Sequence, residues 1–312
     1  MRNLLLTVVV LGVGGYFGAK LYVQYKAERD LDALLTEARP FVDIEYERVV
    51  ATIHGELRAE NVTIRLPQFD DPVVMDSVGV LTPGFLFLLG FDRQEVELPE
   101  FLGVQVAGLR APADADFLRT LDELHEAQTA TLELTPADRC AGTYGLTPAA
   151  LQRLGYHEIV VDFNASFRNA DGRFVMELGA DVENMYAFDV ELTLEGVTDP
   201  AAMARSARPL LVGARLDYFD RSLNSRIAKH CAAEQVARED VIAAQLRQVQ
   251  HIARQQGVEL DAPLIEPYTD FLLGKQRFTL TAAPPKPVDL TRVSLYKPSD
   301  VPNLLNLVAE SG

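Results

Sequence analysis

Residues 159–168 read Ile-Val-Val-Asp-Phe-Asn-Ala-Ser-Phe-Arg, and this stretch decides the fold because apolar and polar side chains alternate along it. The same period of two returns at 174–182 and at 188–194, after polar turns at 169–172 and 183–185. Side chains two residues apart lie on the same face of a strand. The pattern therefore predicts a three-stranded antiparallel meander with one apolar and one polar face, each strand about ten residues or about 33 Å long.

An apolar face of this length has to be covered by helices, by another sheet or by a hydrophobic ligand. Helices are at hand, because apolar residues recur at helical spacing in several segments downstream of the meander and two upstream of it. These segments are 112–128, 147–155, 220–231, 239–256, 263–274 and 299–309. Further strands are expected at 214–218 and 275–281, followed by a stiff Pro-Pro-Lys-Pro connector at 284–287.

The region 41–111 is also typical of β-structure. Alternating residues predict strands at 44–46, 73–81, 94–98 and 104–109, and the runs 53–57 and 62–66 are expected to be two paired strands. Between them, residues 85–91 are almost wholly apolar but far too few to span a bilayer. Two interpretations stay open for this run: a buried turn of helix, or a lip that touches lipid. The lip would be formed by Phe85, Phe87, Leu88 and Phe91.

The N-terminus reads as a single membrane anchor at residues 4–25. Residues 4–19 carry no charge and would span about 24 Å as a helix, and residues 21–23 extend the run toward the roughly 30 Å of the hydrocarbon core. A cleaved signal peptide is the alternative, but no small-x-small cleavage site follows. The positive residues after the span favour a cytoplasmic body, whereas large domains translocate largely regardless of charge, so we expect export. An apolar helical stripe over 27–38 should dock this segment on the body.

Charge and cysteine content narrow the class of protein. The net charge is −16 and the pI is near 4.7, which excludes nucleic acid as a partner and argues against broad adhesion to anionic lipid. The two cysteines, Cys140 and Cys231, fit one disulfide in an oxidising compartment, with two buried free thiols as the alternative.

Part of the N-terminal region resembles a known family. The residues concerned are 54–64 (His-Gly-Glu-Leu-Arg-Ala-Glu-Asn-Val-Thr-Ile), 75–80 (Met-Asp-Ser-Val-Gly-Val), the run 85–91 and 96–99 (Val-Glu-Leu-Pro). Together with the anchor, this order is similar to the N-terminal unit of AsmA-like proteins of Gram-negative envelopes. The resemblance implies an inner-membrane anchor and a periplasmic β-groove that handles lipid. Members of that family are usually much longer, and the helical C-terminal part of this chain argues against a complete intermembrane bridge.

Catalytic patterns are missing from the sequence. There is no Gly-rich phosphate loop, G-x-S-x-G elbow or H-E-x-x-H motif, and the five histidines are scattered without ligand spacing. The carboxylate pair Asp70-Asp71 precedes a proline and reads as a turn, and Asp220 reads as a helix cap. We therefore expect no enzyme activity, no metal and no cofactor.

The predicted fold class is α+β: an N-terminal transmembrane helix followed by antiparallel β-sheets, including the long meander, with packed helices. The expected divisions are an anchor (1–25), a helix extension with an N-terminal β unit (26–111) and an α+β body (112–312). The expected function is envelope maintenance at the inner membrane, with the body in the periplasm binding or passing lipid in an apolar groove. The alternative is a scaffold that binds another envelope protein through a sheet edge. Candidate ligand contacts on the meander are Phe163, Phe167, Phe174 and Met176.

Overall fold

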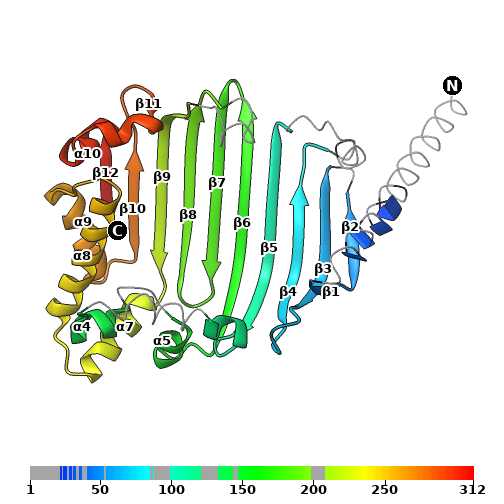
Figure 1. The fold of residues 1–312 in the computed structure, drawn as a ribbon, viewed down its shortest axis with the longest axis horizontal. Helices are drawn as coiled ribbons and strands as arrows, with labels where there is room; N and C mark the ends of the chain where they lie inside the picture. Colours follow the sequence, from blue (N-terminus) through cyan, green and yellow to red (C-terminus); the bar gives the residue numbers. More distant parts are fainter. Residues whose placement is uncertain are drawn as a thin grey trace, which may run out of the picture. The chain divides into compact units, whose positions relative to one another are not determined.

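The computed structural model describes residues 41–52, 54–84, 87, 99–120, 133–142, 147–197 and 208–312, and positions 22, 24–26, 28–29, 31–32 and 35–36. The chain divides into two compact units, Met1–Leu109 and Arg110–Gly312 (Figure 1).

The second unit is built on the predicted meander, which the structure confirms. Strands β6 (Glu158–Ala170), β7 (Arg173–Val182) and β8 (Tyr186–Glu195) pair in antiparallel order, and β9 (Leu210–Asp220), β10 (Arg277–Ala282) and β12 (Leu307–Ser311) continue the sheet. The short β11 (Val288–Asp289) pairs with β9. Asp171 and Gly172 both have positive φ, as a tight two-residue hairpin turn requires. The predicted α+β class, with an antiparallel sheet, is therefore correct.

Helices of the second unit gather at one end of the strands and over the β10–β12 side of the sheet, whereas no labelled helix crosses β6–β8 in Figure 1. They are α4 (Pro136–Ala141), α5 (Pro148–Arg153), α7 (Leu223–Ala233), α8 (Arg238–Gln255), α9 (Ala262–Leu272), α10 (Val301–Leu305) and the 3-10 helices η1 (Leu290–Leu295) and η2 (Pro298–Asp300). Side-chain oxygens of Thr135 and Thr147 cap α4 and α5, and the Asp220 carboxylate accepts the Asn224 N–H at 3.0 Å. Local capping chemistry thus places these helix starts.

Two predicted helices of the second unit have different bounds. The expected helix 299–309 ends at Leu305, because Asn306 adopts a left-handed conformation and Leu307–Ser311 pairs with β10 as strand β12. The helix expected to open at Pro112 begins only at Asp116, since Pro112 still belongs to a strand. The rest of the expected helix, 121–128, lies outside the described residues.

The first unit is also built mainly of β-strands. Its strands are β1 (Asp43–Glu45), β2 (Arg48–Ala51), β3 (Glu56–Arg65), β4 (Val73–Leu81) and β5 (Phe101–Pro112), the last of which crosses the division between the units. The prediction of two paired strands at 53–57 and 62–66 is wrong, because β3 runs without a break from Glu56 to Arg65 and so joins the two runs in one strand. Asn61 has a φ of 53°, yet the register with β4 is kept across it. The phase change in the apolar pattern is therefore a local backbone irregularity and not a turn.

Several expectations fall on residues that are not described. The anchor at 4–25 lies almost wholly outside the described residues, as do the strand 94–98 and the side chains of Phe85, Leu88 and Phe91. Phe87 is described as helical and half-buried. A helix long and apolar enough to cross a bilayer is not found in the described part of the chain.

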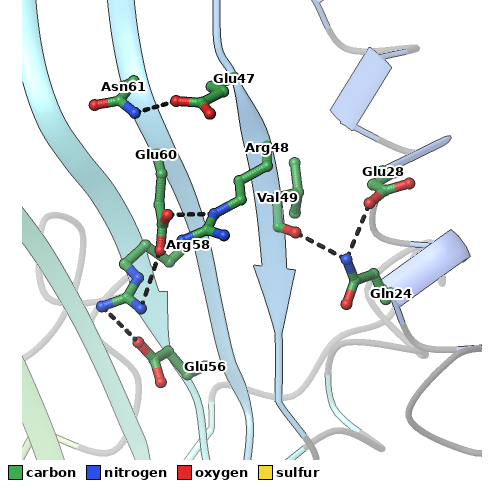
Figure 2. A network of polar contacts seen from close by, with 9 residues as sticks. All are labelled: Gln24, Glu28, Glu47, Arg48, Val49, Glu56, Arg58, Glu60 and Asn61. Atoms are coloured by element: carbon green, nitrogen blue, oxygen red, sulfur yellow. Dashed lines mark hydrogen bonds and ion pairs between the residues drawn. The ribbon is translucent and has the colours of Figure 1, made fainter.

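The helical positions between 22 and 36 contact the edge of the first unit through polar groups. Figure 2 shows the Gln24 amide donating to the Val49 carbonyl of β2 at 3.0 Å, and to Glu28 at 3.2 Å. On the neighbouring strands, Arg48 binds Glu60 at 2.5 Å and Arg58 binds the same carboxylate at 3.2 Å. The apolar stripe predicted to dock this helix lies partly outside the described residues, and the contact that the structure describes is a polar one, a side-chain donor on the carbonyl of edge strand β2. Such a donor leaves fewer backbone groups free at that edge.

One contact of this helix has a measurable pH dependence. The Tyr46 hydroxyl donates to the Asp32 carboxylate at 2.6 Å, and this hydrogen bond, with burial and the negative charge of Asp32, raises the pKa of Tyr46 from 10.0 to about 12. The neutral phenol is favoured in the folded state, so its contribution to stability is full below pH 10 and is lost as pH rises through about 12. The phenolate absorbance difference between the wild type and Tyr46→Phe should show this late titration, and Asp32→Ala should move it back toward pH 10.

Gly55 is a position where a side chain does not fit. Its φ is +91°, and an added Cβ would lie 2.6 Å from the Thr82 carbonyl oxygen and 2.7 Å from the Gly84 Cα. We expect Gly55→Ala to destabilise the protein by about 2 kcal/mol or more, because backbone atoms must move. Gly84→Ala, in the segment after β4 that lies against Gly55, is the control, since an added Cβ meets nothing within 4 Å there. Equal urea midpoints for the two variants would refute the steric argument.

The second unit is closed at one end by a disulfide. Cys140 in α4 and Cys231 in α7 are bonded with their Cα atoms 5.4 Å apart, so the bonded alternative is the correct one. Both side chains are buried in a cluster with residues from α5, the β7–β8 turn and α8, among them Leu151, Met185 and Val241. The bridge therefore joins two helices inside a packed core.

Candidate functional site

The apolar face of the second unit is continuous across its strands. The register aligns three rows of side chains, two residues apart along each strand and on one face. On β6, β7 and β8 these rows are Phe163–Ala180–Phe188, Ala165–Leu178–Val190 and Phe167–Met176–Leu192. We call these nine residues the apolar strip.

Both ends of the strip, along the strands, are closed by buried clusters. The disulfide-linked cluster includes Val182 and Met185, just beyond Ala180. At the other end Phe174, Leu194, Val197 and Leu211 form a second cluster, with Leu194 fully buried. Between these clusters the strip itself is not fully covered, since Met176 is 40% exposed and its neighbours Phe163, Phe167, Leu178 and Val190 are half-buried. The sheet therefore presents a band of accessible apolar surface between two closed ends.

The rows continue from β8 onto β9 and β10, where they form the floor of a pocket. Val190 pairs with Leu216, which pairs with Leu280, and Phe188 pairs with Tyr218, which pairs with Phe278. A cavity of about 420 Å³ lies over Leu216, Tyr218, Phe278 and Leu280. Its roof comes mainly from α9, with residues Leu264, Ile265, Tyr268, Phe271 and Leu272, and from Val249 of α8. We call this the β9–β10 pocket.

Aromatic rings line the β9–β10 pocket and hold its shape. The ring of Phe271 packs edge-to-face on that of Tyr218, with 5.5 Å between the ring centroids, and its centroid lies 6.0 Å from that of Phe278. The centroids of Tyr268 and Phe278 are 5.4 Å apart. Burial raises the pKa of Tyr218 and of Tyr268 above the ordinary phenol value, so both rings are neutral in the folded protein. The pocket is thus an uncharged, aromatic-walled space.

Few polar groups enter the pocket. Asn224 and Gln245 are its polar lining residues. The Asn224 Nδ2 atom is buried and finds no hydrogen-bond partner within the part of the chain that the structure describes. A buried donor without a partner costs free energy that an acceptor atom of a ligand would recover.

The opposite face of the same sheet is polar. Asp217 accepts hydrogen bonds from Arg215 at 2.5 Å, Arg277 at 2.7 Å and Thr279 at 2.7 Å, and the Arg215 guanidinium is the main cause that lowers the pKa of this carboxyl. A shallow hollow of about 230 Å³ beside it is lined by further acids, including Asp189 and Glu191. Nowhere in the described ranges do three or more His, Cys, Asp or Glu side chains come together as a metal site would need. This face reads as a solvated surface held by ion pairs.

The predicted site residues are thus only partly brought together. Phe163, Phe167 and Met176 lie on the apolar strip, but Phe174 is 5% exposed and stacks on Phe167 at 5.4 Å as part of the core. The β9–β10 pocket is not among the sites predicted from the sequence. The signals were present in the alternation of Leu216 with Tyr218 and of Phe278 with Leu280, and in the aromatic residues Tyr268 and Phe271 at helical spacing. Nothing in the sequence indicates that these segments meet.

Comparison with known proteins adds little to this geometry. A family model described only as "Uncharacterized protein" matches residues 179–311. This range runs from within β7 to β12 and includes every lining residue of the β9–β10 pocket. The search among curated proteins finds no match.

Proposed function

We propose that this protein binds lipid, without enzymatic activity, by laying an acyl chain across the apolar strip with its end in the β9–β10 pocket. The observation that carries the proposal is the continuity of the two: half-buried apolar side chains on β6–β8 align, row by row, with the floor of the pocket on β9 and β10. The path crosses five strands, or about 19 Å at about 4.8 Å per strand.

The chemistry of the path favours a linear, mostly apolar ligand. Each buried CH₂ contributes roughly 0.8 kcal/mol, so a chain that leaves water along this path gains affinity with length. Asn224 offers one donor for a carbonyl or hydroxyl oxygen inside the pocket. The charged head group would stay in water beyond the strip, because charges are costly to bury in a site that holds no partner for them.

The cellular setting is part of the same proposal. The apolar N-terminal residues 4–25 would anchor the chain in the inner membrane, and the disulfide between Cys140 and Cys231 is typical of an oxidising compartment such as the periplasm. The resemblance of residues 54–99 to AsmA-like proteins supports lipid handling in the envelope. The proposed role is therefore to hold or pass membrane lipid on the periplasmic side.

Photo-crosslinking tests the proposal. The full-length protein is incubated with a diazirine-labelled palmitate, irradiated, and digested for mass spectrometry. We expect labelled peptides from β9 and α9. Leu178→Asp, on the strip, should reduce labelling roughly tenfold, because a charge would be buried against the chain. Val175→Asp is the matched control, since Val175 is also half-buried in β7 but on the polar face. Equal labelling of the two variants, or none in the wild type, would overturn the assignment.

A second candidate function is a scaffold that binds another protein by strand addition. The observation in its favour is β12, which ends the strand order of the sheet and pairs with β10 alone among the described strands. Its outward-facing Val308 is 45% exposed. Wild-type protein that takes up no acyl probe but protects β12 amides in the presence of an envelope extract would favour this function.

A further inference from the structure

The β9–β10 pocket contains a buried hydrogen-bond donor without a partner. Within the described part of the chain, three buried side-chain polar atoms find no hydrogen-bond partner, and they are Arg58 Nε, Gln248 Oε1 and Asn224 Nδ2. Of these three residues, only Asn224 lines the pocket. Buried polar groups in folded proteins are nearly always hydrogen-bonded, so an unpaired donor on the wall of a cavity points to an acceptor that the protein itself does not supply.

The fold holds Asn224 at this position. The residue lies in the first turn of α7, where its backbone N–H donates to the Asp220 carboxylate at 3.0 Å. Leu223, Ile227 and Cys231 share one face of the same helix and are buried in the disulfide-linked cluster. Asn224 directly follows Leu223 and is therefore turned by about 100° around the helix axis. The helix thus packs one face in the core and presents the Asn224 amide to the pocket.

The pocket favours an uncharged acceptor. Apart from Asn224 and Gln245, the residues that line it are aliphatic or aromatic, so none of the lining residues carries a charge. A carboxylate or phosphate at Asn224 would have no counter-charge among them and would be repelled by the nearby carboxylate of Asp220. A hydroxyl avoids both penalties. It also suits a lining with two amides, because it accepts one hydrogen bond and donates another.

We propose that the preferred ligand is an acyl chain with a hydroxyl group at the end that enters the β9–β10 pocket, and that the Asn224 amide selects it. This inference rests on the proposed function, because the chain has to reach the pocket. The Asn224 Nδ2 atom donates to the hydroxyl oxygen, and the charged end of the chain stays in water. A wholly apolar pocket would instead disfavour the hydroxyl, which would leave water without a partner. The preference for an oxygen at the chain end therefore depends on one side chain.

Competition binding tests this selectivity. Full-length wild type, Asn224→Leu and Gln245→Met are each labelled with the diazirine palmitate in the presence of increasing unlabelled palmitate or ω-hydroxypalmitate. Leucine has nearly the shape of asparagine, and the backbone N–H of residue 224 remains to bind Asp220. Gln245→Met is the matched control, since it replaces the other amide of the lining by an apolar side chain of similar length. Comparison between variants cancels the different solubilities of the two acids.

We expect ω-hydroxypalmitate to compete about tenfold better than palmitate for the wild type, a difference typical of one well-placed hydrogen bond. Asn224→Leu should reverse this order, whereas Gln245→Met should keep it. Asn224→Leu should also raise the urea midpoint of the ligand-free protein, because it removes a buried donor without a partner.

Four results would each overturn the inference. They are equal competition by the two acids in the wild type, as expected if a water molecule alone satisfies the amide, an unchanged order in Asn224→Leu, the same reversal in Gln245→Met, and a lower urea midpoint for Asn224→Leu, which would mark Asn224 as a purely structural residue. Normal palmitate labelling of the wild type in any of these cases would leave the proposed function intact. Absence of palmitate labelling would overturn the proposed function and this inference together.

Discussion

Replacing both Cys140 and Cys231 by alanine is expected to lower the free energy of unfolding of the second unit by about 4 kcal/mol. The two residues are 91 positions apart in the sequence, so the bond closes a long loop and removes much of the conformational freedom of the unfolded chain. The bond is also buried among apolar side chains, so its loss leaves a small defect in that core. Urea unfolding followed by circular dichroism measures the change.

Reduction of the wild type provides the control for this prediction. Wild-type protein in excess dithiothreitol should unfold at the same urea concentration as the double alanine variant, within the small difference that two sulfur atoms make to packing. A double variant as stable as the oxidised wild type would mean that the loop is already restricted in the unfolded state.

Leu194→Ala is expected to lower the free energy of unfolding by about 3–4 kcal/mol, the second largest effect expected. Leu194 is 0% exposed and packs with Phe174, Val197 and Leu211 in the cluster that closes one end of the apolar strip. Because its buried neighbours come from β7, β9 and the segment after β8, the cavity left by alanine cannot readily collapse. Thermal or urea unfolding gives the measurement.

Leu192→Ala is the matched control, since Leu192 lies two residues earlier on the same strand and face but is only half-buried. Leu192→Ala should lower the free energy of unfolding by less than half as much as Leu194→Ala, because Leu192 buries less apolar surface in the folded protein. Comparable losses for the two leucines would show that the strip is as tightly covered as the core, and would argue against an accessible binding surface.

The meander could be predicted from sequence because its signal is local. Alternation over 158–195 and a two-residue turn with Asp171 and Gly172 specify strands, faces and register without reference to the rest of the chain. Where the backbone is irregular, the alternation of apolar residues did not predict the strand bounds correctly. The left-handed Asn61 shifts the apolar phase inside β3, which made one strand look like two.

Strand β9 shows the same effect. The register slips between Thr193 and Leu194 on β8, where Thr193 faces Gly213 but Leu194 faces Leu211. A bulge of this kind moves an odd-numbered residue onto the face of its even-numbered neighbours. The alternation therefore seemed to begin at Ala214, whereas the strand begins at Leu210. Similarly, residues 307–311 are too few for their alternation to predict a strand. They form strand β12 because they pair with β10.

The candidate site was predictable only in part for a related reason. Phe163, Phe167 and Met176 lie on one face of the sheet, which the alternation of apolar residues predicts. Their exposure depends on where helices from distant parts of the sequence pack. The pocket needs Leu216 from β9, Phe271 from α9 and Phe278 from β10 to converge, and that convergence is a property of tertiary packing. Phe174, identical in pattern to its neighbours, became core because it lies next to Leu194 rather than in the middle rows.

The pairing of β12 with β10 has a consequence for the order in which the chain acquires its structure. The hairpins of β6, β7 and β8 join segments adjacent in sequence and can form within about 1–10 μs of their synthesis. β10, in contrast, waits for a partner that begins 25 residues later, at Leu307, which takes about 1–5 s at ribosomal rates of about 5–20 residues per second. Throughout that interval one edge of β10 has no neighbour, and α9 lacks one of the strands against which it packs. The nascent protein thus passes through a stage with an unpaired strand edge, the condition under which chaperones are recruited and under which a truncated chain would aggregate.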